Sequence, residues 1–184
     1  MNITSRQLTT IMPQAYNNKN LSLYVAYLNG YADVFHIDTP LRMAHFLAQV
    51  AHETSELQHM KELGNADYCA KYDVGKLKQM LGNTKKGDGY KYKGRGMMQL
   101  TGRANYQAYQ NSKLCKGDIM NNPSLLEQPL GATKSGMWYW NSRKINTMAD
   151  KDNVEGVTRL INGGTNGLAS RKKYLERAKK AFGI

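Results

Sequence analysis

The chain has 184 residues, of which 41% are hydrophobic and 22% charged, as in an ordinary soluble globular domain. The formal net charge of +12 is unusual, and it indicates an anionic partner or surface: nucleic acid, an acidic cell-wall polymer or membrane headgroups. No segment approaches the roughly 18 apolar residues of a membrane span, so we expect no stable membrane insertion.

The N-terminal residues show no basic segment followed by an apolar run, so we expect no secretory signal. The protein should then stay in a cytosol unless another factor releases it. The length suits one domain over residues 1–184, because no repeat or low-complexity linker divides the chain. Cys69 and Cys115 lack metal-ligand spacing, and we expect reduced thiols rather than a disulfide.

The spacing of apolar residues predicts a mainly helical protein. Six of the predicted helices have both ends marked, at residues 3–16, 21–31, 73–81, 130–141, 152–161 and 169–182. Two more are predicted to begin at residue 39 and near residues 101–103. Between them, residues 83–106 are rich in glycine and alternate tyrosine with lysine, which predicts a loop that runs into a short strand or hairpin. The expected fold is therefore mainly α with one small β-hairpin-like excursion.

The stretch from Thr39 to Leu63 carries the feature on which the functional interpretation depends. Thr39 can cap a helix, and Pro40 suits the first helical position because no N–H is needed there. Residues 43–51 are apolar on nearly every side, which predicts a buried helix. Glu53 follows on the core side of this helix, where a carboxylate is costly unless it is paired or protonated.

Two explanations of Glu53 remain open from its position alone. It could pair with a lysine or arginine side chain at a helix end. Alternatively, burial could raise its pKa so that it stays protonated near neutral pH and acts as a general acid.

Other kinds of site are disfavoured by spacing. A zinc-protease motif needs histidines at its first and fifth positions, whereas His52 is followed at that spacing by Glu56, and His59 lies off that face. The glycines around Arg95 match neither a Walker nor a dinucleotide pattern. The alternating residues 90–93 could grip single-stranded nucleic acid, but an exposed polar hairpin explains them better. No local signature supports a nucleophilic serine or cysteine site.

Carboxylate pairs suit glycoside hydrolysis. That reaction needs a protonated acid and a second carboxylate, about 6.5–9.5 Å away for direct attack by water or about 5–5.5 Å for a covalent intermediate. Glu53 is a candidate for the acid, and spacing alone does not choose a partner among four residues: Glu56, Glu62, Asp67 and Asp73.

Five segments, in order, resemble glycoside hydrolase family 19, the chitinase-like enzymes, and most closely its bacteriophage endolysin branch. They are FLAQVAHET (46–54), KEL (61–63), YKGRGMMQLTGRANY (92–106), NNPSLL (121–126) and INGGTNGL (161–168), and they cover nearly the whole chain. The resemblance implies a lysozyme-like α+β fold with a central cleft between two lobes, and hydrolysis with inversion at the anomeric carbon.

The resemblance also implies roles for individual residues. Glu53 matches the general acid, preceded by His52 in the substrate-binding region, and Glu62 matches the second carboxylate. Thr101 matches the hydroxyl residue that helps hold the attacking water. The positions that match sugar-binding residues are Gln99, Asn105, Asn162 and Arg171. No metal or organic cofactor is implied.

Helix geometry gives a separate expectation about the two carboxylates. Nine residues along an unbroken helix span roughly 13 Å, which is too far for a water shared by Glu53 and Glu62. We therefore predict that the helix ends soon after Glu53 and that the chain turns to bring Glu62 back across the cleft.

The resulting hypothesis is an endolysin, a lysozyme-like enzyme that cleaves β-1,4 bonds in the glycan strands of bacterial peptidoglycan and causes host lysis. We expect a monomer that binds no nucleic acid and stays in the host cytoplasm until a separate membrane-permeabilising protein releases it. The basic residues 171–173 and 177–180 could draw it to an anionic envelope, or form only a solvated face. The alternatives are a chitinase and a non-catalytic cationic wall- or membrane-binding protein.

Overall fold

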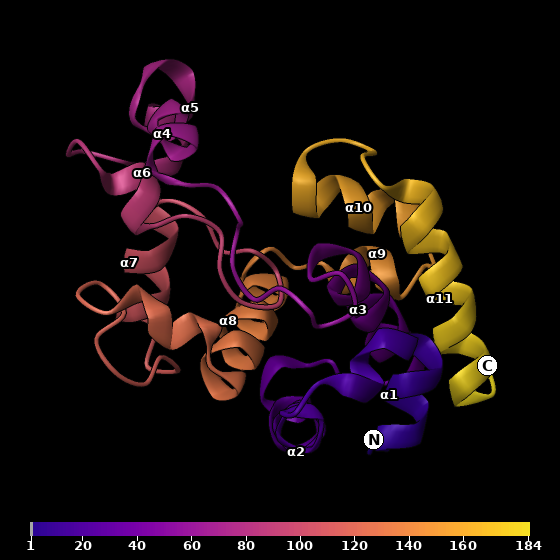
Figure 1. Ribbon diagram of the computed structural model, residues 1–184. Helices are drawn as coiled ribbons and strands as arrows, with labels where there is room; N and C mark the ends of the chain where they lie inside the picture. The colour runs from indigo at the N-terminus through magenta and orange to yellow at the C-terminus, as the bar shows by residue number, and fades with distance from the viewer. Residues whose placement is uncertain (1) are drawn as a thin grey trace. The chain divides into compact units, whose positions relative to one another are not determined.

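The computed structural model describes residues 2–184 and is mainly helical, as predicted (Figure 1). The chain falls into two compact units. Unit 1 comprises residues 2–59 and 137–184, and unit 2 comprises residues 60–136. Helix α8 (Pro129–Ser142) begins in unit 2 and ends in unit 1. No helix among residues 2–184 is both long enough and apolar enough to cross a membrane.

Unit 1 is built from helices at both ends of the chain. Its helices are α1 (Ser5–Ile11), α2 (Leu21–Tyr31), α3 (Pro40–Glu53), α9 (Asn146–Ala149), α10 (Val154–Asn162) and α11 (Leu168–Phe182), with 3-10 helices at Pro13–Asn17 and Asp33–Phe35. The predicted first helix is divided, because Pro13 cannot donate the hydrogen bond that would continue α1. Thr4 caps α1 in a reciprocal pair of hydrogen bonds with Gln7.

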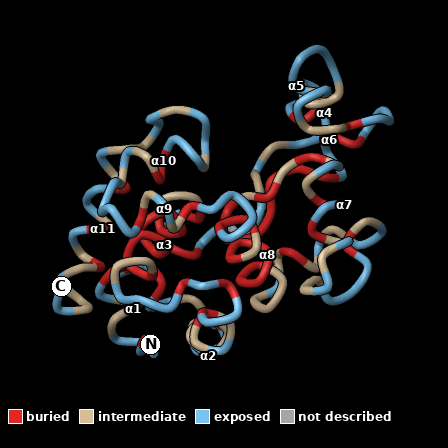
Figure 2. The backbone as a smooth tube through the Cα atoms, turned by 180° about the vertical axis from the view of Figure 1, so that it is seen from behind, coloured by how far each residue is buried: buried red, intermediate tan, exposed pale blue. Residues whose placement is uncertain are grey.

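The core of unit 1 forms where α3 packs against α11. Nine consecutive residues of α3, 43–51, are buried, which confirms the prediction of a buried helix. The ring of Phe46 meets that of Trp140 edge-on, with centroids 5.4 Å apart. In Figure 2 this helix is drawn largely in the buried colour. The residue at the end of α3 therefore sits on a closely packed support.

Unit 2 consists of short helices and turns. Its helices are α4 (Ala66–Cys69), α5 (Gly75–Leu81), α6 (Asp88–Lys91), α7 (Arg103–Asn111) and the first part of α8, with 3-10 helices at Ala70–Asp73 and Pro123–Glu127. Cys69 and Cys115 both lie in this unit as free thiols, in agreement with the expectation of no disulfide.

The predicted hairpin in residues 83–106 is wrong in extent. Within the described residues this region holds only isolated antiparallel bridges, Lys61 with Arg95 and Arg95 with Leu100. The second bridge closes a tight turn in which Gly96 and Gln99 both have positive φ. Residues 88–91 form α6 instead of a strand. The helix begins at Asp88, whose carboxylate accepts hydrogen bonds from backbone amides of the preceding turn.

That side chain, Asp88, is the most heavily hydrogen-bonded carboxylate of unit 2. Arg103 donates to both of its oxygens, at 2.7 and 2.6 Å, and the amides of Thr84 and Lys85 donate to Oδ2 at 2.8 and 2.9 Å. Burial alone would raise the pKa of Asp88, but these hydrogen bonds outweigh it and hold the pKa well below its usual range.

Replacement of Asp88 with asparagine should destabilise the protein by about 3 kcal/mol at neutral pH, because Arg103 then lacks its anionic partner. A depressed pKa stabilises the fold above the unfolded-state pKa of about 3.9, and this contribution disappears as the pH falls toward the folded-state value. The difference in thermal stability between parent and variant should therefore shrink below about pH 4. Thermal unfolding across pH measures this, with Asp67→Asn as an exposed control. A difference that does not change with pH would contradict the prediction.

Candidate active-site residues

Glu53 is the last residue of α3, which confirms the prediction that the helix ends there. Ser55, Glu56 and Leu57 follow with φ of 49°, 60° and 66°, a run of left-handed residues that stops the helix. Thr54 closes this turn, since its hydroxyl donates to the Val50 carbonyl at 2.7 Å and accepts from the Leu57 amide at 2.8 Å. Leu57 therefore does not extend the apolar face of α3.

Glu56 holds this turn against the rest of unit 1. Its buried carboxylate accepts hydrogen bonds from the backbone amide of Gln14 at 2.7 Å and from the hydroxyl of Tyr174 at 2.8 Å. Burial, together with the hydrogen bond to Glu56, raises the pKa of Tyr174 to about 12. These contacts stabilise a strained backbone immediately after Glu53.

The carboxylate of Glu53 is paired with Arg171 of α11. Nη2 of Arg171 donates to Oε1 of Glu53 at 2.6 Å, and Nη1 donates to Oε1 of Gln49. The Glu53 side chain is 17% exposed, whereas that of Arg171 is 2% exposed. Of the two explanations that the sequence left open, the structure shows the carboxylate paired with a basic side chain.

The role predicted for Arg171 changes accordingly. A side chain this deeply buried, with its guanidinium on Gln49 and Glu53, is not available to contact a sugar or to attract an anionic envelope. Arg171 instead fixes the position of the Glu53 carboxyl group. Among the other basic residues of α11, Arg177 lies 3.9 Å from Glu56 and Lys179 pairs with Asp152.

His52 is held by the first turn of α11 and by the loop that precedes this helix. Its Nδ1 lies 3.2 Å from the hydroxyl of Ser170. Burial, and secondarily the positive charge of Arg171, lower the pKa of His52. Gly167 is tightly packed against this ring, because a Cβ atom there would lie 2.2 Å from both Cε1 and Nε2 of His52. The glycine is further required by its φ of 72°.

Gly167→Ala should therefore both strain the backbone and displace His52. Gly163 supplies a matched control, since it has a φ of 74° in the same loop but nothing within 4 Å of the position that an added methyl group would take. Each alanine should cost about 1 kcal/mol for its left-handed backbone, and Gly167→Ala should lose about 1–3 kcal/mol more from the clash. Chemical denaturation of both variants measures the difference, and equal losses would show that His52 yields without cost.

Asn162, predicted to bind sugar, is the exposed last residue of α10. Its amide nitrogen donates to the carbonyl of Asn166 at 3.1 Å, and its amide oxygen accepts from the amide of Gly164 at 2.8 Å. The side chain therefore shapes the same loop that supports His52.

In unit 2, Glu62 is fixed by backbone and side-chain contacts. It exchanges hydrogen bonds with Gly94, donating from its amide at 2.8 Å and accepting on Oε2 at 3.2 Å. The hydroxyl of Tyr72 donates to Oε1 at 2.8 Å. Burial and the hydrogen bond to Glu62 raise the pKa of Tyr72 above its usual range.

Two more predicted residues, Gln99 and Thr101, lie at the same glycine, and a third, Asn105, contacts Thr101. A Cβ on Gly94 would lie 2.8 Å from Oε1 of Gln99 and 3.2 Å from Oγ1 of Thr101. Thr101 donates to the carbonyl of Gln99 at 2.7 Å, and Asn105 donates to the carbonyl of Thr101, also at 2.7 Å. The structure thus brings Glu62 together with Gln99, Thr101 and Asn105, which are distant from it in sequence.

A buried arginine anchors this cluster. Arg95 donates to Glu127 at 2.8 Å, to the Lys91 carbonyl at 2.8 Å and to the Tyr106 hydroxyl at 3.1 Å. Tyr106 in turn donates to the carbonyl of Lys93 at 2.8 Å. These bonds fix the backbone on both sides of Gly94, so Glu62 and Thr101 are held by a rigid segment.

Several supporting residues were not predicted. Gln49 lies one helical turn before Glu53, and that spacing could have identified it as a neighbour of the carboxylate. Gly94 was recognised only as part of a motif. Tyr72 and Ser170 are remote in sequence from Glu62 and His52, and no local pattern identifies them.

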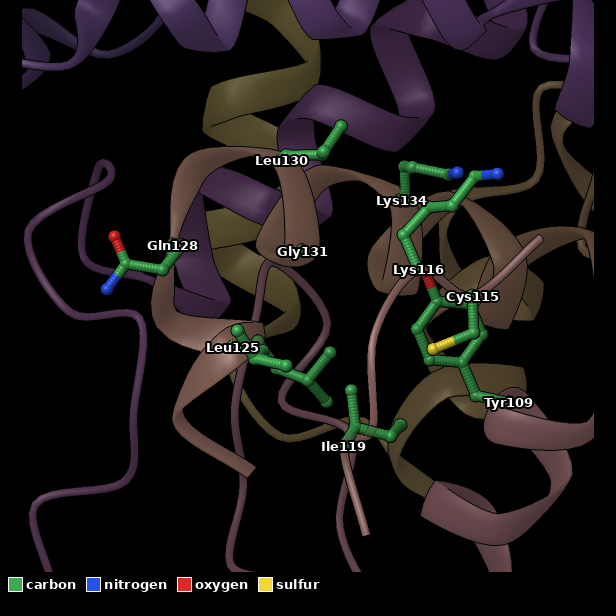
Figure 3. A pocket seen from close by; sticks show the side chains of 10 residues that line it. Tyr109, Cys115, Lys116, Ile119, Leu125, Gln128, Leu130, Gly131 and Lys134 are labelled. Atoms are coloured by element: carbon green, nitrogen blue, oxygen red, sulfur yellow. The ribbon is translucent and has the colours of Figure 1, made fainter. Parts of the chain in front are cut away.

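Unit 2 also contains a cavity of about 130 Å³ that no predicted site residue lines (Figure 3). Burial raises the pKa of the Cys115 thiol, and burial with the nearby Lys116 lowers the pKa of Lys134. The other lining residues are Tyr109, Ile119, Leu125, Leu126, Gln128, Leu130 and Gly131.

Across residues 2–184 no three His, Cys, Asp or Glu side chains are grouped so that they could hold a metal ion.

Comparison with known proteins identifies the family of this chain. A family model described as chitinase class I, of glycoside hydrolase family 19, matches residues 22–166. A glycosyl hydrolase family 19 domain-containing protein of Haemophilus influenzae is 34% identical over 161 residues, covering 72% of this chain and 76% of that protein. Endochitinase 1 of Theobroma cacao is 34% identical over 113 residues, covering 53% of this chain and 32% of that protein.

Solved structures agree with this relationship. Chitinase C from Streptomyces griseus has the same fold, with a TM-score of 0.76 at 24% identity, over 99% of this chain and 93% of that one. A second bacterial family 19 chitinase gives a TM-score of 0.75 at 25% identity, over 99% and 95%. The chain spans only about a third of the length of the cacao endochitinase. The chain belongs to glycoside hydrolase family 19, whose members are chitinase-type glycosidases.

Proposed function

We propose that this protein is an endolysin that hydrolyses β-1,4 glycosidic bonds in bacterial peptidoglycan. The observation that carries the proposal is the placement of Glu53, a partly exposed carboxyl group held at a helix end by one buried arginine. A general acid must present one oxygen to the leaving group in a fixed direction. Family membership supports glycoside hydrolysis as the reaction class.

Glu53 is proposed to donate the proton to the glycosidic oxygen. Arg171 binds Oε1, which as a carbonyl oxygen can accept that hydrogen bond while the acid is protonated. The transferable proton is then assigned to Oε2. His52, the preceding residue, is proposed to orient the bound sugar chain.

Glu62 is proposed to activate the attacking water, with Thr101 as a second hydrogen-bonding partner of that water. Tyr72 and the amide of Gly94 each bind one oxygen of Glu62 and so orient its carboxylate. Direct attack by water gives inversion at the anomeric carbon.

Gln99, Asn105 and Asn162 are proposed to bind the N-acetyl sugars. Amide side chains both donate and accept hydrogen bonds, and so match the amides and hydroxyls of these sugars. The contacts of these residues with neighbouring backbone fix their orientation before a ligand arrives. Such preorganisation lowers the entropy lost on binding.

The net charge of +12 supports peptidoglycan as the substrate, because its peptide carboxylates and the surrounding envelope are anionic whereas chitin is uncharged. Chitin is the second candidate, since the relatives in plants and the structural neighbours are named as chitinases. The endolysin role also entails lysis of a bacterial host after release from its cytoplasm.

Parallel digestion of purified peptidoglycan sacculi and chitin oligomers tests the proposal. We expect the turbidity of the sacculi to fall and soluble glycan fragments to appear. Mass spectrometry of these fragments identifies the sugar at their reducing end. Rapid cleavage of chitin with intact sacculi would assign a chitinase. Binding to sacculi without cleavage of either polymer would assign a non-catalytic wall-binding protein.

A further inference from the structure

The segment 63–90 of unit 2 exposes an unusual amount of apolar surface. Of the eleven large hydrophobic side chains exposed among residues 2–184, six lie in this short segment: Leu63, Tyr68, Val74, Leu77, Met80 and Tyr90. In Figure 2, α4 and α5 are drawn largely in the exposed colour. Single exposed apolar residues are normal, but a cluster of them indicates a contact surface.

Helix α5 forms the centre of this surface. None of its residues is buried, although it contains Leu77, Met80 and Leu81. Leu81 points toward α7, because its side chain packs against Gly102. Val74, which directly precedes the helix, Leu77 and Met80 follow one another at spacings of three residues and are 63%, 43% and 69% exposed, so they form an outward band beside Leu81. A short helix normally depends on burial of its apolar band, so this band lacks a covering partner within its unit.

Lysines border the band on both sides. Lys78 lies one turn after Val74, and Lys76 lies one turn before Met80, so each is a neighbour of the band on the helix surface. None of the ion pairs found in residues 2–184 involves Lys76, Lys78, Lys85 or Lys86.

Two of the three acidic residues in the segment are already occupied, and the third, Asp67, is exposed among five lysines. Asp73 accepts hydrogen bonds from the amides of Gly87 and Gly89, and Asp88 pairs with Arg103. The ammonium group of Lys71 lies 3.4 Å from the ring centroid of Tyr68, so a cation and an aromatic ring lie together on this surface.

We propose that residues 63–90 dock on the surface of an anionic lipid bilayer, with the band of α5 facing the acyl chains and the lysines facing the headgroups. This arrangement of apolar and basic side chains is that of an interfacial helix, which lies on a membrane and does not span it. Polysaccharide offers no hydrocarbon to cover Leu77 and Met80. A second copy of the chain would bring the same positive charges together.

Sedimentation with vesicles tests the proposal on the full-length protein. Vesicles of equimolar phosphatidylglycerol and phosphatidylcholine should bind the protein, and vesicles of phosphatidylcholine alone should bind it much more weakly. The double variants Leu77→Ser/Met80→Ser and Lys76→Glu/Lys78→Glu should each lower the partition coefficient by about ten-fold or more.

Matched controls lie in unit 1. Leu23→Ser/Val34→Ser removes two similarly exposed apolar side chains, and Lys172→Glu/Lys173→Glu reverses two exposed charges of α11. Both controls should stay within about three-fold of the parent. Equal losses in the control and segment variants, or no binding of the parent to anionic vesicles, would overturn the proposal.

Hydrogen–deuterium exchange of the unaltered protein gives a measurement that does not depend on variants. Addition of the anionic vesicles should slow exchange in peptides from residues 63–90. Protection confined to α11 or to other parts of unit 1 would contradict the assignment. If the segment variants lose binding to sacculi but keep binding to vesicles, the partner is the wall polymer and the proposal is wrong.

Discussion

Replacement of Glu53 with glutamine should lower the rate of glycan hydrolysis by about 10²–10⁴-fold, the usual contribution of a general acid. Glutamine keeps the shape of the side chain, and its Oε1 can still accept the hydrogen bond from Arg171. It has no proton that it can transfer to a leaving oxygen. The rate constant is expected to fall while binding to sacculi changes little, because the protein still folds around Arg171. Turbidity loss and sacculus sedimentation measure the two quantities.

Glu176→Gln is the matched control, because Glu176 is an exposed carboxylate on α11, five residues after Arg171. It should lyse sacculi at the parent rate. The same assay on Glu62→Gln tests the proposed base. Lysis by Glu53→Gln at the parent rate would remove Glu53 from the mechanism, whatever the effect at Glu62.

The sequence predicted the helical scaffold well because its signals are local. Thr39 and Pro40 mark the start of α3, and the apolar run that follows identifies the buried helix. The bounds of α2 were also predicted correctly, at Leu21–Tyr31. The end of α3 at Glu53 followed from a geometric requirement rather than from residue preference, since none of the three left-handed residues after Thr54 is a glycine.

The environment of Glu53 could not be predicted in the same way. Its partner, Arg171, lies 118 residues further along the chain, and one basic residue among many on α11 gives no sign that it alone is buried. The contact of Tyr72 with Glu62 is similar, because it depends on how α4 and the following 3-10 helix pack. Motif resemblance identified residues that gather at Gly94, but not the bonds that hold them.

The strongest structural prediction concerns Arg171. Arg171→Met keeps the length of the buried stem but removes the donors to Gln49 and Glu53. A buried charge that loses its partner typically costs about 3–5 kcal/mol, and we expect about 2–4 kcal/mol here because Glu53 remains partly exposed to water. Chemical denaturation measures the loss. Arg171→Lys should recover only part of it, since a single ammonium group cannot reproduce the planar fork.

A double-mutant cycle separates the ion pair from other effects of the substitution. In Glu53→Gln/Arg171→Met a neutral amide replaces the carboxylate that would otherwise lose its partner, so the double variant should be more stable than the sum of the single losses predicts, by about 1–3 kcal/mol. This coupling should be present at neutral pH and at low salt and high salt alike, because the Arg171 side chain is excluded from solvent. Additive losses would mean that Arg171 stabilises the fold through packing alone, and Glu53 would then need another group to fix the direction of its proton.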